Sequence, residues 1–114
     1  MGDSRMTDQL AADATLERLV ERLVSVYHPH AIYLFGSRAS GHPRVDSDYD
    51  LYVVVPDDTP LEALSLVGAY EAIRPLRIAA DVIPCRKSIF EKRKHAVGTM
   101  AYTVWTEGVR VYGA

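Results

Sequence analysis

Three aspartates, Asp48, Asp50 and Asp81, are the residues of this chain best suited to hold a metal ion. Residues two apart on a β-strand project to the same face, so a strand carrying Asp48 and Asp50 would present both carboxylates together. Two like charges at that range repel each other unless a cation lies between them. Hard carboxylate oxygens suit Mg²⁺, which also takes waters and substrate phosphates as ligands. The alternative is a solvated strand start whose acidic side chains merely face water.

The third aspartate, Asp81, interrupts the apolar run from Ile78 to Ile83. An aspartate among such neighbours is rarely buried unless it is paired or bound to metal. If its strand lies beside the strand of Asp48 and Asp50, three carboxylates converge. Such a cluster is typical of metal-dependent phosphoryl or nucleotidyl transfer. The alternative for Asp81 is an edge-strand carboxylate that faces solvent.

A possible phosphate-binding turn, Gly36-Ser37-Arg38, directly follows a short apolar segment. Glycine allows a sharp turn and lets a ligand approach the backbone closely. A helix that begins at Ser37 would direct free N–H groups at a phosphate. The Ser37 hydroxyl and the Arg38 guanidinium also suit phosphate oxygens. A strand that ends in Gly-Ser is more often a plain turn.

The elements that must position these residues alternate between helical and extended patterns. Apolar residues three and four apart predict a first helix from position 7 or 8 to Tyr27, ended by His28-Pro29. We expect strands at residues 31–35, 48–55 and 77–83, the last ended by Pro84, and a small edge strand at 109–112.

Capping patterns predict the remaining helices. One should begin at Thr59-Pro60 and reach Arg74, a second should begin at Ser88, and a third should cover 98 or 99 to 107. A helix between the second and third strands makes them a parallel pair. The sequence therefore predicts an α/β fold, a small mixed β-sheet packed with helices.

Composition excludes several other classes of protein. The 114 residues fit a single domain over 1–114, and 48% hydrophobic residues are ordinary for a globular chain. The longest strictly apolar run, residues 51–55, is far too short to cross a membrane. A formal net charge of -2 offers no broad electrostatic reason to bind nucleic acid. One cysteine cannot form an intrachain disulfide, so we expect a cytoplasmic protein.

Taken together, the motif residues resemble the signature of the minimal nucleotidyltransferase family of the DNA polymerase β superfamily. Gly36-Ser37 is followed by ten residues and then by Asp48-x-Asp50, and Asp81 stands where that family carries its third carboxylate. The resemblance implies a polymerase β-like nucleotidyltransferase core. It also implies that Asp48 and Asp50 hold two Mg²⁺ ions with the triphosphate of ATP, and that Asp81 binds one metal and acts as base or orients the attacking hydroxyl.

The resemblance further implies that Gly36 and Ser37 grip the β- and γ-phosphates, with Arg38 as a helper. The reaction would transfer AMP from ATP to a hydroxyl and release pyrophosphate. Tyr49 occupies a place where the family commonly has an aliphatic residue, and we expect it to face away from the metals.

The same family suggests a role and a partner. Minimal members often act as antitoxins that transfer AMP to a tyrosine of a HEPN-type toxin. Because the chain has space for little more than the catalytic core, we expect the acceptor to be another polypeptide, as in a hetero-oligomer. Two alternatives remain, a non-catalytic antitoxin that neutralises its partner by binding, and a nucleotidyltransferase acting on an aminoglycoside-like small molecule.

Two further features lie outside this signature. The segment 86–95 is basic and could meet an acidic partner or a phosphate, or it could be a solvated helix face. Tyr102 and Trp105 lie three apart on the last predicted helix and are expected to anchor the core. An exposed tryptophan would instead indicate an interface.

Overall fold

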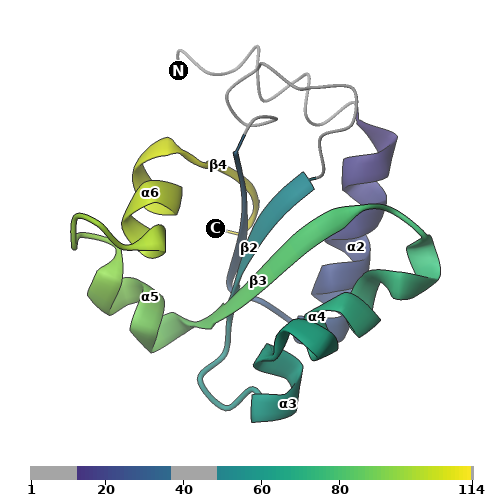
Figure 1. Cartoon of the computed structure of the whole chain (residues 1–114), viewed down its shortest axis with the longest axis horizontal. Coiled ribbons are helices and arrows are strands. Elements are labelled where there is room, and N and C mark those ends of the chain that lie inside the picture. Colours follow the sequence, from purple (N-terminus) through teal and green to yellow (C-terminus); the bar gives the residue numbers. More distant parts are fainter. Residues whose placement is uncertain (1–12, 37–48, 114) are drawn as a thin grey trace.

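A four-stranded mixed sheet in the order β3-β2-β1-β4 forms the centre of the molecule (Figure 1). The structure is a computed structural model and describes residues 13–36 and 49–113. The strands are β1 (Ala31–Phe35), β2 (Tyr49–Val55), β3 (Ala80–Arg86) and β4 (Val109–Gly113). Strand β1 is antiparallel to β2 and β4, whereas β2 and β3 are parallel. The predicted mixed sheet, its parallel pair and the edge position of the last strand are confirmed.

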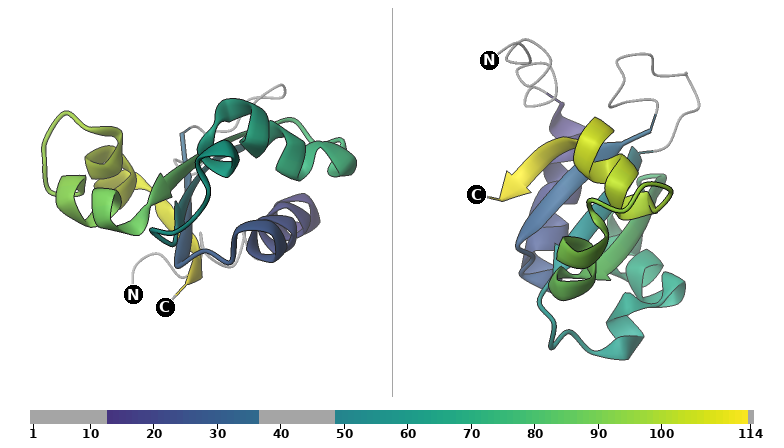
Figure 2. Two further views of the ribbon diagram at one scale, coloured as in Figure 1. Left: turned by 90° about the horizontal axis from the view of Figure 1, so that it is seen from below. Right: turned by 90° about the vertical axis from the view of Figure 1, so that its left-hand side faces the viewer.

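Helices cover both faces of this sheet (Figure 2). Helices α2, α3 and α4 lie on one side, and α5 and α6 lie on the other. The helices are α2 (Ala14–Tyr27), α3 (Leu61–Leu64), α4 (Leu66–Ile73), the 3₁₀ turn η1 (Arg74–Leu76), α5 (Lys87–Arg93) and α6 (Met100–Glu107). None of these described helices has the length and apolar character needed to cross a membrane. The α/β fold class is confirmed.

Strand β2 is the most deeply buried element because both of its faces are covered. Its odd-numbered residues, such as Leu51 and Val53, pack with α2 and α4. Its even-numbered residues Tyr52 and Val54 pack with α5 and α6. Strands covered on both faces have nearly continuous apolar sequences. Every residue of β2 except Asp50 is buried.

Helix α2 presents the apolar stripe that the sequence predicted. Leu19 and Leu23 are fully buried against the sheet. Asp13 caps the helix by accepting hydrogen bonds from the backbone N–H groups of Thr15 and Leu16. The helix ends at His28, whose left-handed conformation (φ 49°) stops the helical path before Pro29. The predicted start of this helix at position 7 or 8 is wrong, because Asp13 has the extended backbone of an N-cap and the helix begins at Ala14.

The predicted helix from Thr59 to Arg74 is wrong in two respects. The Thr59 hydroxyl donates to the carbonyl of Pro56 instead of capping the helix. The helix also breaks at Ser65, whose extended backbone separates α3 from α4 and whose Oγ accepts from the Gly68 N–H at 2.9 Å. Serine hydroxyls compete with helical hydrogen bonds in this way, which the capping-box pattern at Thr59 did not reveal.

The predicted third strand is displaced. Strand β3 covers Ala80–Arg86 instead of 77–83, and Pro84 lies inside it opposite Val53. Proline cannot donate to a ladder, but an edge strand has one side without a neighbour and tolerates it there. Arg77, at the predicted strand start, instead adopts the left-handed conformation that ends η1.

The start of α5 also differs from its capping-box prediction. Ser88 lies within the helix rather than at its N-cap. The carboxylate of Asp57, from the turn after β2, accepts a hydrogen bond from the Ser88 N–H at 2.9 Å. This bond lowers the pKa of Asp57 below its ordinary value of 3.8. A residue thirty-one positions earlier therefore supplies the cap, which local sequence patterns cannot reveal.

Replacing Leu51 by alanine should destabilise the protein by about 3 kcal/mol, because Leu51 is fully buried and a cavity would remain. Urea denaturation measures this change in the free energy of unfolding. The matched control is Leu66→Ala, since Leu66 is 78% exposed and should change stability by less than about 0.5 kcal/mol. Equal costs for the two substitutions would contradict the assigned core.

Replacing Asp57 by alanine should lower stability at neutral pH, because the cap of α5 is lost. A carboxyl whose pKa is lowered by folding stabilises above its unfolded pKa, and this stabilisation disappears as pH falls through the folded value. The difference between wild type and Asp57→Ala should therefore shrink below about pH 4. The urea midpoints of both proteins at several pH values measure this difference in stability. The matched control is Asp58→Ala, the same substitution at an exposed neighbour, which should cost less stability at neutral pH than Asp57→Ala.

Candidate active site

Asp50 and Asp81 are direct partners in the parallel register of β2 and β3. Partners in a parallel pair project to the same side of the sheet, here the side of Tyr52 and Ile83. Asp50 is half-buried, whereas Asp81 is exposed on the edge strand. The expectation that the two strands are neighbours is thus confirmed. Asp81 is not held in an apolar interior, however, because it is only the second residue of its strand and lies at the open edge.

Gly36 brings the backbone against the carboxylate of Asp50. It follows β1 directly, and the preceding residue, Phe35, is the register partner of Asp50. Its φ of +82° is one that side chains rarely adopt, and a Cβ at this position would collide with Oδ2 of Asp50. Glycine is therefore required at position 36 for two reasons, the positive φ of the turn and the close approach of the backbone to Asp50.

Three of the predicted site residues, Ser37, Arg38 and Asp48, lie outside the described residues. Within ranges 13–36 and 49–113, no group of three or more His, Cys, Asp or Glu side chains is placed to hold a metal ion. The described carboxylates, Asp50 and Asp81, nevertheless offer the hard oxygen donors that Mg²⁺ prefers. Because Gly36 has no side chain, the Asp50 carboxylate can lie directly against the backbone of the turn. These residues fit a magnesium site that needs at least one further ligand.

Tyr49 lies on the opposite face of β2 from Asp50, as predicted. Its ring is buried with α2, and its hydroxyl donates to Oδ2 of Asp13 at 2.7 Å. Asp13 thus caps α2 and also anchors the start of the strand that carries Asp50. Sequence reasoning missed this role. The only local signal was an aspartate just before the helical stripe, which indicates a cap but not its partner.

An aromatic layer lies beneath the carboxylates on the same face. The rings of Phe35 and Tyr52 meet edge to face at 6.4 Å, and Tyr52 packs against Phe90 at 5.8 Å. Burial raises the pKa of Tyr52 well above its ordinary value, and a hydrogen bond with Cys85 adds to the effect. Tyr52 therefore stays protonated in the neutral range and serves as packing under the site.

A cavity of about 400 Å³ adjoins Asp81 at the outer edge of the sheet. Arg74 and Arg77 line it together with Tyr70 of α4. Arg74 forms an exposed ion pair with Glu71 at 3.0 Å, and Arg77 is exposed. Sequence reasoning missed these residues because nothing local distinguishes them from other surface arginines. The cavity is large enough for part of a substrate to approach Asp81.

The mixed sheet, the carboxylate pair and the glycine turn define a nucleotidyltransferase domain of the polymerase β type. The family described as "Polymerase beta, Nucleotidyltransferase" matches residues 17–114. The chain belongs to this family. Among proteins of curated function, none matches it.

Two solved structures share the fold. One is a presumed nucleotidyltransferase from Sulfolobus solfataricus, with a TM-score of 0.59 and 18% identity over 95% of this chain and 86% of that chain. The other is a toxin–antitoxin with AMP-PNP, with a TM-score of 0.55 and 20% identity over 86% of this chain and 73% of that chain. At these identities the similarity establishes the fold alone.

Replacing Gly36 by alanine should destabilise the protein by more than the strain of placing alanine in a left-handed conformation. That strain is about 1 kcal/mol, and the new Cβ must also displace the Asp50 carboxylate. The matched control is Gly98→Ala, because Gly98 has a similar φ of +95° but no atom within 4 Å of the Cβ that alanine would add. Urea denaturation should give the larger loss for Gly36→Ala. Equal losses would contradict the close approach of Gly36 to Asp50.

Proposed function

We propose that this chain is a Mg²⁺-dependent nucleotidyltransferase that transfers AMP from ATP to a hydroxyl of a partner polypeptide. We further propose that it acts in this way as the antitoxin of a toxin–antitoxin pair, with a tyrosine of a HEPN-type toxin as the acceptor. The observation that carries the proposal is the register pairing of Asp50 with Asp81 beside the Gly36 turn. Membership of the nucleotidyltransferase family supports the same chemistry.

In this proposal the carboxylates of Asp48, Asp50 and Asp81 hold the metal, and the turn at Gly36, Ser37 and Arg38 holds the phosphates. Bound Mg²⁺ would stabilise negative charge on the attacking and leaving oxygens. The glycine at position 36 lets the turn lie directly against Oδ2 of Asp50, which brings the proposed phosphate-binding turn next to the proposed metal ligands.

The reaction is an in-line displacement at the α-phosphorus of ATP. The acceptor oxygen forms a new bond to the α-phosphorus, and the bond to the oxygen that bridges to the β-phosphorus breaks. Pyrophosphate leaves, and the hydroxyl proton passes to the Asp81 carboxylate and then to solvent. Asp81 suits this role because it is exposed and adjoins a cavity, so an acceptor can reach it while Asp50 stays half-buried.

A polypeptide acceptor is supported by the surface of α3 and α4. Leu61, Leu66, Val67 and Tyr70 are between 62% and 78% exposed. The opposite side of α4 is buried through Ala69, Ala72 and Ile73, so this helix is apolar nearly all round. A helix of that kind is normally covered on both sides. Tyr70 also lines the cavity that ends at Asp81, which links this surface to the site. The similar fold of a toxin–antitoxin with AMP-PNP adds support for the toxin partner.

Replacing Asp48, Asp50 or Asp81 by asparagine should lower AMP transfer by about a hundredfold or more, because each change removes a metal-binding charge. The assay combines the purified chain, the product of the adjacent gene, Mg²⁺ and ATP labelled at the α-phosphate. Label in the partner and released pyrophosphate are both measured. Removal of Mg²⁺ with a chelator should abolish both signals.

The matched control is Asp58→Asn, an identical change at an exposed aspartate of the turn after β2. It should leave transfer unchanged. Label transfer that persists in the doubly substituted Asp48→Asn, Asp50→Asn chain would overturn the assigned site. Absence of transfer by the wild type, with neutralisation of the partner equal in wild type and double variant, would instead establish a non-catalytic antitoxin.

A further inference from the structure

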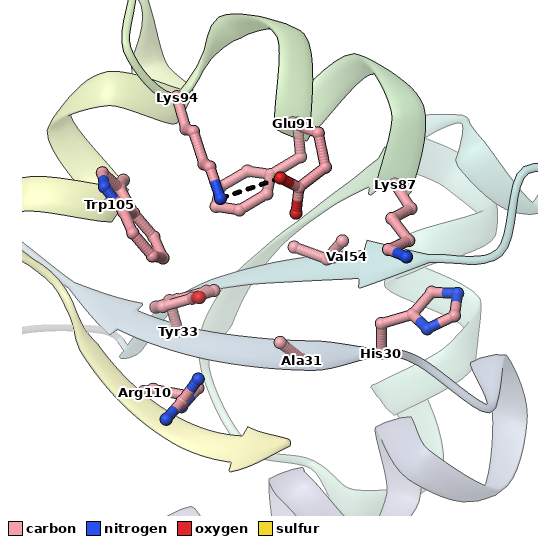
Figure 3. A pocket seen from close by; sticks show the side chains of 10 residues that line it. His30, Ala31, Tyr33, Val54, Lys87, Glu91, Lys94, Trp105 and Arg110 are labelled. Carbon is pink, nitrogen blue, oxygen red and sulfur yellow. Dashed lines mark ion pairs between the residues drawn. The ribbon is translucent and has the colours of Figure 1, made fainter. Parts of the chain in front are cut away.

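A second cavity, of about 380 Å³, lies between α5, α6 and the β1–β4 side of the sheet (Figure 3). We refer to it as the α5 cleft. Tyr33, Val54 and Phe90 form its apolar floor. It shares a sheet face with Asp50 and Asp81, but it extends toward the opposite end of β2, where Val54 lies four residues from Asp50. The α5 cleft is therefore separate from the candidate active site.

Cationic side chains line the α5 cleft from two separate elements. Lys87 and Lys94 belong to α5, and Arg110 belongs to β4 (Figure 3). Among the described residues, Glu91 is the one acidic side chain that lines the cleft. The whole chain carries a net charge of -2, so this surface has the opposite sign from the protein as a whole. An anionic occupant would complement the charge of this surface.

Lys94 is held firmly at the centre of the cleft wall. Its ammonium lies 2.8 Å from the carboxylate of Glu91 and 4.2 Å from the centre of the Trp105 ring. Its side chain is only 16% exposed. The hydrogen bond from Lys94 lowers the pKa of Glu91, so this ion pair persists at neutral pH. The carboxylate of Glu91 is thus already paired with Lys94.

Trp105 does not anchor the core as the sequence predicted. Helix α6 buries Ala101 and Val104 instead, and Trp105 remains 40% exposed at the cleft. Its ring makes edge contacts with Tyr33 and Phe90 at 6.5 and 6.2 Å, so its position is fixed. A rigid, half-exposed tryptophan beside cations is typical of a protein–protein contact.

Two observations favour a carboxylate-bearing occupant over a nucleotide or a free phosphate. Phosphate sites commonly use free backbone N–H groups at a helix start, but at α5 the Ser88 N–H is already bonded to Asp57. The Lys94 ammonium also covers the Trp105 ring, which hinders stacking of a base on that face. A carboxylate depends on neither feature, because it can pair directly with the ammonium of Lys87.

We propose that the α5 cleft docks an acidic segment of a partner polypeptide, with carboxylates against Lys87 and Arg110 and an apolar side chain on the floor beside Trp105. This docking does not depend on the proposed nucleotidyl transfer. It gives the basic segment 86–95 a specific role in place of a merely solvated helix face.

The test uses the intact chain and its sole tryptophan as reporter. The probe is a short synthetic peptide in which glutamate alternates with leucine and phenylalanine, and binding is followed by Trp105 fluorescence and by anisotropy of the labelled peptide. The peptide should bind and change the Trp105 emission. A version with glutamine in place of glutamate should bind at least about tenfold more weakly, since the charge attraction is lost.

Lys87→Glu should raise the dissociation constant of the acidic peptide about tenfold at low salt. The matched control is Lys92→Glu, which makes the same charge change on α5 at an exposed residue outside the cleft, and it should raise the constant less than about twofold. Equal effects of the two variants would overturn the proposal in favour of general charge attraction. Failure of the peptide to bind, or its displacement by AMP or inorganic phosphate, would overturn it as well.

Discussion

The pairing of β2 with both of its neighbours is the constraint on which the rest of the structure depends. Six of the seven residues of β2 are buried, and Asp50 is the exception. A slip of one residue would turn Asp50 into the core formed with α2 and α4 and would turn Leu51 out of it. Burying an unpaired carboxylate is costly, so the hydrophobic pattern of β2 also selects the register that places Asp50 beside Asp81.

The two faces of the sheet have different roles. On one face, α2 is joined to the segment of α3 and α4 by packing and by two hydrogen bonds, from Arg22 Nε to the carbonyl of Ala72 and from the Tyr27 hydroxyl to the carbonyl of Ala63. This rigid half holds β2 in place. The other face carries Asp50 and Asp81 near one end and the α5 cleft toward the other. A partner could therefore contact the α5 cleft without covering the carboxylates.

Local sequence patterns predicted the elements whose boundaries depend on neighbouring residues. They failed for elements whose boundaries depend on residues far away in the sequence. The apolar stripe of α2 and the end of α6 at Glu107 follow from neighbouring residues, and both are confirmed. The start of α5 depends on Asp57, and the passage of β3 through Pro84 depends on its edge position. Both are decided by chain segments far apart in sequence. The roles of Ser37, Arg38 and Asp48 stay predictions, because these residues lie outside the described part of the chain.

By itself, the sequence determined the alternation of helices and strands, the face of β2 that carries Asp50, and the family to which the chain belongs. These properties depend on apolar periodicity and on residue spacing, which can be read directly. Only the tertiary structure decided that Asp81 stands opposite Asp50, that Gly36 presses against that carboxylate, and that Lys87, Lys94 and Arg110 surround one cleft. Each of these contacts joins separate elements, and their distances are set by how the sheet and helices pack.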